Sequence, residues 1–332
     1  MKTRRFIARH PLAFAVATLV VCLAVYSAVA TADTPSPIFP AAAATIPALI
    51  AYWLSRPILW AGAARKRDAR VLALAAIGAA VVVSALGIAL GAFEPHASDI
   101  PLIAGQGADF SPVLSLLTIA AVCAFTGIYE EAAFSAVLFG GLRLYYARDD
   151  NDTNPEKDTD CPSESRQSNG VATGGNRRNE ASAPTPCSPI RSLTRQMLGK
   201  AAAVQGVAFA LAHIVTALLA SAQGATPVMV GQIIVWFAAT FLFGVVTAVL
   251  MEYGRSLTLN AIVHAVYDFA LFGPLALKAG TMRSATITGD ATDLALFAAQ
   301  ACLLAVILIA LYGIGKRRGA KMDDGNIQWE AP

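Results

Sequence analysis

Two adjacent carboxylates, Glu130 and Glu131, lie inside an apolar stretch that is long enough to cross a membrane. The residues on either side of the pair, 113–127 and 136–142, include no charged side chain. An ionised carboxylate at the centre of a bilayer costs at least about 2.5–3.5 kcal/mol, and such residues usually face a bundle interior or a watery cavity. The pair therefore marks the centre of a candidate site.

Three further titratable groups lie within apolar stretches. His213 ends the segment Phe209-Ala-Leu-Ala-His213, and His264 begins the segment His264-Ala-Val-Tyr-Asp268. Residues four apart share a helix face, so Phe209 is expected to pack against His213, and Asp268 can touch His264. A carboxylate in that position can orient an imidazole and fix its tautomer. Any one of these groups alone could be a structural hydrogen-bonding residue, whereas the whole set favours acid–base chemistry.

The composition indicates what must position these side chains. The chain has 332 residues, 56% hydrophobic and 14% charged, with a mean hydropathy of +0.57, whereas soluble domains carry about 25% charged residues. Runs of about 20 apolar residues, the length that crosses a bilayer core, predict an all-α transmembrane bundle of eight helices. These are Pro11–Ala30, Ile38–Ala63, Val71–Phe93, Pro112–Tyr146, Leu198–Ala220, Val228–Met251, Leu257–Leu277 and Leu294–Ile314. The fourth is too long for one straight crossing and must tilt, kink near Gly127 or extend past the interface.

The chain divides into three parts by composition. Residues 1–111 hold the first three spans, 112–277 the candidate site, and 278–332 the last span and a basic tail. Within the second part, residues 148–194 are rich in Asp, Asn, Ser, Gly and Pro, a composition that cannot bury enough apolar surface to fold alone. We expect a disordered cytoplasmic loop there, either an inert insertion or a regulatory segment. The first span is expected to be retained, because its apolar run exceeds the 7–15 residues of a signal-peptide core.

Lys and Arg are distributed unevenly among the loops. They are concentrated in 1–10, 65–70, 143–148, 191–200 and 316–318, whereas 31–37, 94–111 and 221–227 contain none. The positive-inside rule therefore places both termini in the cytoplasm. Counting about 1.5 Å per helical residue from the cytoplasmic ends puts Glu130 and His213 roughly 18 Å deep and His264 roughly 10 Å deep. These three groups can meet in the cytoplasmic half of the bilayer.

The pattern resembles a known family. Glu130-Glu131, Phe209-x-x-x-His213 and His264-x-x-x-Asp268, in this order on successive membrane helices, are similar to the three motifs of the CPBP family. That family comprises CAAX-processing type II and bacteriocin-processing (Abi-like) intramembrane proteases. The resemblance covers about 112–277. It implies hydrolysis of a peptide bond in a substrate associated with the cell membrane, with the bilayer as surroundings and no nucleic-acid partner.

Two positions depart from the family pattern. The first motif is normally Glu-Glu-x-x-x-Arg, and Ser135 stands at the Arg position. Glu131 thus lacks the cation expected one turn away, and we expect it to be protonated or exposed to water unless another helix supplies a cation. Arg143 lies too far along the same helix to replace the motif arginine. The third motif commonly ends in Asn, and an ionised Asp268 can hold His264 but cannot donate a hydrogen bond.

The resemblance implies a division of roles. Glu130, assisted by His213, would be the general base that activates a water molecule, and His264, oriented by Asp268, would stabilise the oxyanion. The implied mechanism uses no cofactor. A zinc ion held by Glu130, His213 and His264 is the alternative, since two His and one Glu can form a catalytic zinc site. However, the chain has no His-Glu-x-x-His segment.

Two other classes of function remain open. A catalytically impaired scaffold or immunity-type protein would keep the fold while tolerating Ser135 in place of arginine. A proton-coupled transporter would also place carboxylates and histidines within the membrane, but the chain has no repeat of broken helices of the kind that many transporters show.

Overall fold

The computed structural model describes residues 2–32, 36–60, 64–95, 99–103, 111–153, 195–221, 226–283 and 287–323. In this part of the chain, eight helices are long and apolar enough to cross a membrane. They span Pro11–Ala30, Ile38–Leu59, Lys66–Leu90, Pro112–Ala147, Met197–Val215, Pro227–Gly254, Leu257–Ala279 and Ala291–Gly313. The all-α bundle of eight spans predicted from the sequence is confirmed, and the protein is a multi-pass membrane protein.

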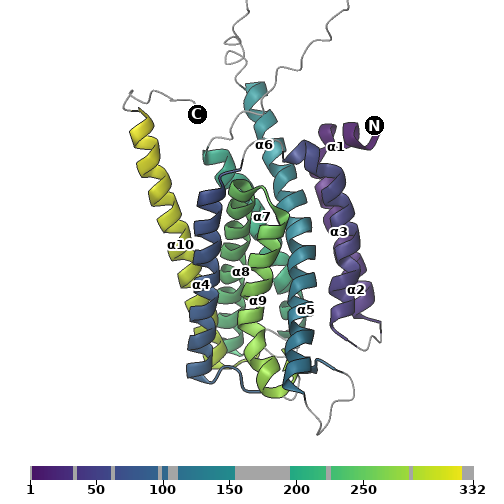
Figure 1. Cartoon of the computed structure of the whole chain (residues 1–332), viewed down its shortest axis with the longest axis vertical. Helices are drawn as coiled ribbons and strands as arrows, with labels where there is room; N and C mark the ends of the chain where they lie inside the picture. The colour runs from purple at the N-terminus through teal and green to yellow at the C-terminus, as the bar shows by residue number, and fades with distance from the viewer. Residues whose placement is uncertain are drawn as a thin grey trace, which may run out of the picture.

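The elements follow one another with short connections in most of the described chain. They are α1 (Lys2–Arg9), α2 (Pro11–Ala30), α3 (Ile38–Leu59), α4 (Lys66–Leu90), β1 (Ile100–Pro101), α5 (Pro112–Glu130), the π-helix η1 (Glu131–Leu138), α6 (Phe139–Thr153), α7 (Arg195–Ser221), α8 (Pro227–Gly254), α9 (Leu257–Ala279), β2 (Thr281–Met282) and α10 (Ala291–Asp323). The strands β1 and β2 form a short antiparallel ribbon. The helices run side by side along the long axis of the molecule (Figure 1).

Local sequence signals set where the site-bearing helices begin. The hydroxyls of Ser111, Thr226 and Ser256 cap α5, α8 and α9 by accepting a hydrogen bond from the backbone N–H three residues later. Such caps satisfy N–H groups that have no partner inside the helix. Pro112 and Pro227 occupy the first helical position, where the missing N–H of proline costs nothing.

The fourth span is one continuous helical rod made of α5, η1 and α6. Its length is accommodated by extension, because α6 continues to Thr153, six residues into the segment predicted to be a loop; residues 154–194 of that segment lie outside the described residues. The departure from α-helical geometry lies at Glu131–Leu138 rather than at Gly127, and the N–H of Phe139 bonds to the carbonyl of Phe134, five residues back. Short π-helical segments occur frequently at functional sites.

Glycines bring the motif-bearing helices close together. A Cβ on Gly127 of α5 would lie 2.8 Å from the carbonyl oxygen of Ala261 on α9. A Cβ on Gly244 of α8 would lie 3.1 Å from both the Cα of Gly206 and the Cβ of Phe209 on α7. Real Cβ atoms essentially never come as close as 2.8 Å, so α5 can touch α9 at this separation only with glycine at position 127. The 3.1 Å contacts at Gly244 are tighter than most Cβ contacts, so a side chain there would require α7 or α8 to shift slightly.

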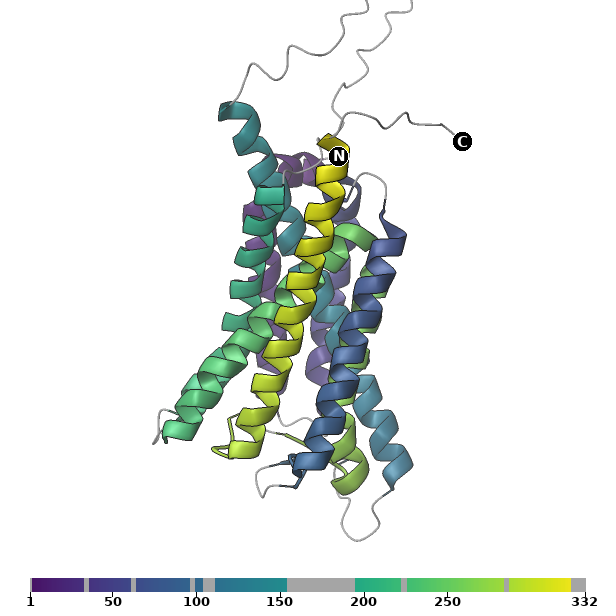
Figure 2. The same ribbon diagram turned by 90° about the vertical axis from the view of Figure 1, so that its left-hand side faces the viewer.

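The other helices surround this core. The pair α2 and α3 packs beside α5 and η1, and α10 lies on the outside, against α4 and α8 (Figure 2). Figure 1 shows α1 and the end of α10 at the same end of the bundle, as an even number of spans requires. The cytoplasmic location of that end stays a prediction from the distribution of Lys and Arg.

Candidate functional site

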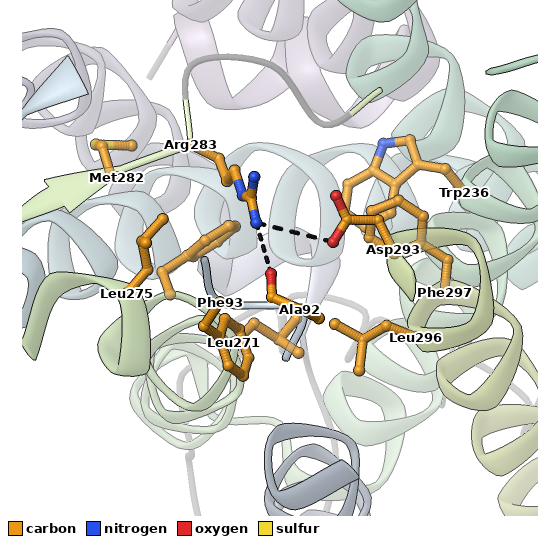
Figure 3. Close-up of a pocket in the computed structure, with 11 residues that line it drawn as sticks. Ala92, Phe93, Trp236, Leu271, Leu275, Met282, Arg283, Asp293, Leu296 and Phe297 are labelled. Atoms are coloured by element: carbon orange, nitrogen blue, oxygen red, sulfur yellow. Dashed lines mark hydrogen bonds and ion pairs between the residues drawn. The ribbon is translucent and has the colours of Figure 1, made fainter. Parts of the chain in front are cut away.

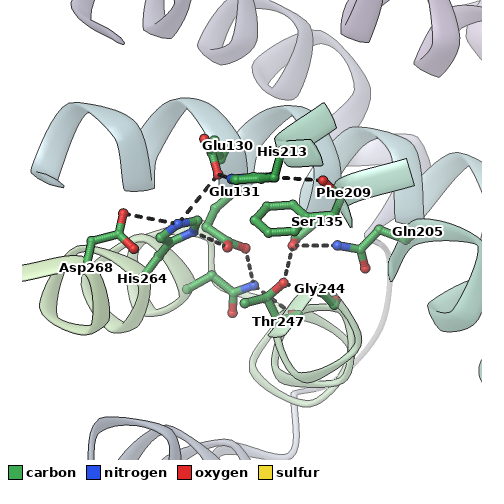
Figure 4. A network of polar contacts seen from close by, with 11 residues as sticks. Glu130, Glu131, Ser135, Gln205, Phe209, His213, Gly244, Thr247, His264 and Asp268 are labelled. Carbon is green, nitrogen blue, oxygen red and sulfur yellow. Dashed lines mark hydrogen bonds and ion pairs between the residues drawn. The ribbon is translucent and has the colours of Figure 1, made fainter. Parts of the chain in front are cut away.

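Glu130, the last residue of α5, lies between two imidazole rings from other helices. Its Oε2 is 3.4 Å from Nε2 of His213 on α7 and 3.5 Å from Nε2 of His264 on α9. Figure 4 shows the three side chains converging from their separate helices. The structure thus brings the three sequence motifs together at one carboxylate oxygen.

Glu131, the first residue of η1, has different surroundings. Its Oε1 lies 2.7 Å from Nδ1 of His264, and its Oε2 accepts a hydrogen bond of 2.9 Å from Nδ2 of Asn260. Its side chain is only 1% exposed. The expectation of a water-exposed Glu131 is therefore wrong, because His264 and Asn260 occupy the positions that water would take.

Asp268 and Glu130 lie near the same ring nitrogen of His264. Its Oδ2 lies 3.4 Å from Nε2 of His264, the ring nitrogen that also faces Glu130. The closest carboxylate to this imidazole is Glu131, on the opposite nitrogen. The expected contact between His264 and Asp268 is present, but the shortest contact on the ring comes from the neighbouring glutamate.

His213 is fixed by its own helix. Its Nδ1 lies 2.8 Å from the carbonyl oxygen of Phe209, and because a carbonyl only accepts, Nδ1 carries the hydrogen of that bond. The ring of Phe209 lies 4.3 Å from the His213 ring, centroid to centroid, and 6.0 Å from that of His264. Phe209 therefore packs the site as the spacing predicted, and Nε2 of His213 is the nitrogen that meets Glu130.

The exposure of the five side chains divides them into two groups. Glu130, His213 and Asp268 keep 10%, 26% and 17% of their side-chain surfaces exposed. Glu131 and His264 keep 1% and 3%. The side chain of Glu130 is thus less enclosed than that of Glu131, although its Oε2 is itself buried.

Four fully buried neutral polar residues extend the site: Ser135, Gln205, Thr247 and Asn260. The sequence singled out only Ser135, and the other three were missed. Ser135 donates to Oγ1 of Thr247 at 3.0 Å and faces Nε2 of Gln205 at 3.4 Å (Figure 4). One signal was available, since Asn260, His264 and Asp268 recur every four residues, on one face of α9.

Arg143 lies outside the site, as expected. Its guanidinium donates to the carbonyl oxygen of Leu59 at 2.9 Å and lies 3.1 Å from Oε2 of Glu252. Glu252 is also paired with Arg255 at the end of α8. This cluster links α3, α6 and α8, so Arg143 does not pair with a residue of the site.

The next question is whether the acidic and imidazole side chains are grouped so that they could hold a metal ion. Among the described residues, no group of three or more His, Cys, Asp or Glu side chains has the geometry to hold a metal ion. The triad considered for zinc consists of Glu130, His213 and His264. Both imidazoles approach the same oxygen, Oε2 of Glu130, with Nε2 of His213 at 3.4 Å and Nε2 of His264 at 3.5 Å. They are placed for proton exchange with that carboxylate.

A separate pocket lies near the ends of α4 and α9 and the start of α10. Its walls are mainly apolar, and Arg283 donates to the carbonyl of Ala92 while lying 3.9 Å from Asp293 (Figure 3). The pocket is lined by none of the motif residues. Arg283 is the residue that links the end of α4 to the start of α10.

These features define a class: a membrane helix bundle with a cluster of acid–base residues enclosed by three of its spans. Residues 112–270 match a family model described as Type II CAAX prenyl endopeptidase Rce1-like. This central region of the chain is thus similar to the Rce1-like family, which confirms the resemblance to the CPBP family. Searches of curated proteins and of solved structures found no match.

Proposed function

We propose that the protein is an intramembrane endopeptidase that hydrolyses a peptide bond in a membrane-associated peptide or protein. The observation that carries this proposal is the position of Glu130, with Oε2 3.4 Å and 3.5 Å from the imidazoles of His213 and His264. The match of residues 112–270 to an endopeptidase family supports it.

Glu130 and His213 are placed to activate water. A water molecule within hydrogen-bond distance of both groups would lose a proton to Glu130 as its oxygen attacks the scissile carbonyl carbon. General-base catalysis of this kind contributes about 10²–10⁴-fold to the rate. When the tetrahedral intermediate collapses, the C–N bond breaks and the protonated Glu130 returns the proton to the leaving amine.

His264 is placed to stabilise the negative oxygen of that intermediate. Its Nδ1 lies 2.7 Å from Oε1 of Glu131, and in the protonated ring both nitrogens carry a hydrogen, so Nε2 can donate on the side of Glu130. A donor aimed at a developing oxyanion is often the largest single contribution to catalysis. Asp268, at 3.4 Å from the same nitrogen, would hold this hydrogen when ionised and could donate its own when protonated.

We propose that the reaction uses no metal. The shared contacts of Glu130 with both imidazoles, and the absence of a ligand-like group of three among the described residues, support a glutamate mechanism. Zinc bound by Glu130, His213 and His264 is the rival, since it would supply an activated water by a different route.

We further propose that the protein lies in the cell membrane with the site in the cytoplasmic half. The basic loops support this orientation. Substrates would be membrane-embedded or membrane-associated peptides and proteins, which reach Glu130 from the side on which His213 and Asp268 are exposed.

The test is cleavage of a membrane-peptide library by purified protein in nanodiscs. Glu130→Gln should abolish turnover without changing thermal stability or peptide binding, because it keeps the shape but removes the base. Glu94→Gln, at an exposed ion pair with Lys278, is the control and should cleave as the wild type does. Cleavage by Glu130→Gln at the wild-type rate would refute the proposal. If the wild type binds peptides without cleaving them, the result supports the scaffold function. If Glu130→Gln alters a pH-dependent flux across the membrane, the result indicates a transporter.

A further inference from the structure

The position of the missing motif arginine is surrounded by neutral groups. The hydroxyl of Ser135 donates to Thr247 at 3.0 Å, and the amide of Gln205 approaches it at 3.4 Å. All three side chains belong to fully buried residues. The space around Ser135 is thus occupied by a network of uncharged hydrogen bonds that links η1 to α7 and α8.

Asn260 continues this network to Glu131. Its Nδ2 donates to the backbone carbonyl of Thr247 and to Oε2 of Glu131, both at 2.9 Å. A carbonyl and a carboxylate only accept, so the nitrogen of the amide must face them and the orientation of Asn260 is fixed. The hydrogen bond between Asn260 and Glu131 joins two fully buried residues, so Asn260 restrains the position of Oε2 of Glu131.

The second oxygen of Glu131 transmits that restraint to the imidazole. Oε1 lies 2.7 Å from Nδ1 of His264, so the direction of the carboxylate sets the direction of the ring. The ring in turn determines where Nε2 points, between Glu130 and Asp268. The side chain of Asn260 donates to Thr247 and Glu131, so any effect on Glu130 or Asp268 passes through Glu131.

We propose that Asn260 is a positioning residue that takes over the role of the motif arginine: it holds Glu131, and through Glu131 it fixes the orientation and protonated nitrogen of His264. This inference rests on the proposed peptidase function for its catalytic consequence, but its structural part does not. The protein is accordingly a complete enzyme with a neutral support for Glu131 rather than a decayed one.

A purely structural role for Asn260 is the competing explanation, because its bond to Thr247 also ties α9 to α8. Gln232 offers a matched control. It is a fully buried amide that ties α8 to the segment before α10, donating to Asp290 at 2.7 Å and to Thr288 at 3.2 Å, and it belongs to none of the site contacts. Gln232→Leu should therefore lower stability without changing catalysis.

The experiment compares Asn260→Ala, Asn260→Asp and Gln232→Leu with the wild type. In metal sites, loss of a hydrogen-bond partner that orients a ligand costs about 10–100-fold in affinity or activity. We expect a fall in kcat of the same order, about 10–100-fold, in Asn260→Ala, with KM nearly unchanged and an altered pH profile. Asn260→Asp has nearly the same size and should lose at least as much, because it faces Glu131 with a second acceptor. Ser135→Arg alone should bring no gain in activity.

The ¹⁵N NMR signals of His264 provide a readout that needs no substrate. Asn260→Ala and Asn260→Asp should change the signals of Nδ1 and Nε2, whereas Gln232→Leu should leave them as in the wild type. Unchanged His264 signals, kcat and pH profile in both Asn260 variants would overturn the inference and leave Asn260 as an interhelical tie. A strong gain of activity in Ser135→Arg would also overturn it. If no form of the protein cleaves peptide while the signals change as expected, the peptidase proposal fails and the positioning role stands.

Discussion

Nδ1 of His264 lies 2.7 Å from Oε1 of Glu131, while Nε2 of the same ring lies 3.5 Å from Oε2 of Glu130. One imidazole thus contacts both members of the adjacent carboxylate pair. The sealed Glu131 meets one nitrogen, and the more accessible Glu130 meets the other. This arrangement gives two chemically identical neighbours different surroundings, which is the basis for proposing Glu131 as the support of His264 and Glu130 as the base.

Removing the imidazole of His264 tests its role at the oxyanion. We expect His264→Ala to lower kcat by about 10²–10³-fold, the usual cost of losing one oxyanion donor. The measurement is single-turnover cleavage in nanodiscs, with the partly exposed His10 replaced by alanine as the control. Loss of substrate affinity at unchanged kcat would instead assign His264 to binding.

Asp268, the last residue of the third motif, can be tested by replacing it with asparagine. Asp268→Asn keeps the size of the side chain and supplies an N–H donor at 3.4 Å from the ring nitrogen. Because Asn is the usual residue at this motif position, we expect activity to be kept or raised. Steady-state kinetics at several pH values check this, and complete inactivation would show that the carboxylate itself is required.

Chelation distinguishes the two mechanisms for water activation. If Glu130 is the base without a metal, prolonged treatment with a strong chelator followed by gel filtration should leave kcat unchanged. Metal content is measured on the same sample, so that a tightly held ion is not overlooked. Activity that disappears on chelation and returns with zinc would establish Glu130, His213 and His264 as ligands instead.

The contact between α5 and α9 depends on Gly127. A methyl group there would lie 2.8 Å from the carbonyl oxygen of Ala261, so Gly127→Ala should destabilise the protein by about 1–3 kcal/mol through overpacking. Activity should fall too, since the same contact places Glu130 beside His264. Gly78→Ala on α4 is the control, because a Cβ there meets nothing within 4 Å; thermal unfolding in detergent compares the two. Equal midpoints would show that α5 and α9 can separate without cost.

Arg143 is expected to matter for stability and not for chemistry. Its side chain is 6% exposed and pairs with Glu252 at 3.1 Å, and breaking a buried pair by removing one partner costs about 3–5 kcal/mol. We expect Arg143→Leu to fall at the low end of that range, because Glu252 keeps Arg255 as a second partner. Normal stability combined with lost turnover would make Arg143 the functional replacement for the motif arginine.

The fold could be predicted from the sequence because each membrane span is a local property. Runs of about 20 apolar residues identify crossings without knowledge of their neighbours, and the eight predicted spans match those of the structure. The motif residues were also visible, since charged groups within such runs are rare. The four-residue spacing placed Phe209 with His213, and His264 with Asp268, on shared faces, as found.

The contacts between helices could not be read in this way. Glu131 was expected to be protonated or exposed to water because its likely partner was sought one turn away on the same helix, whereas its partners, Asn260 and His264, come from α9. The π-helix was missed for a related reason. Its residues, Glu131–Leu138, are all buried against other helices, and tertiary packing rather than local propensity stabilises such a segment.

The π-helix also has a consequence for the helical phase of the fourth span. A residue of an α-helix turns about 100° around the axis, whereas the wider turns of η1 turn less per residue. The side chains before Glu131 and those after Leu138 are therefore offset in angle from the positions that an uninterrupted α-helix would give them. The segment thus lets one helix satisfy two sets of neighbours whose angular positions differ.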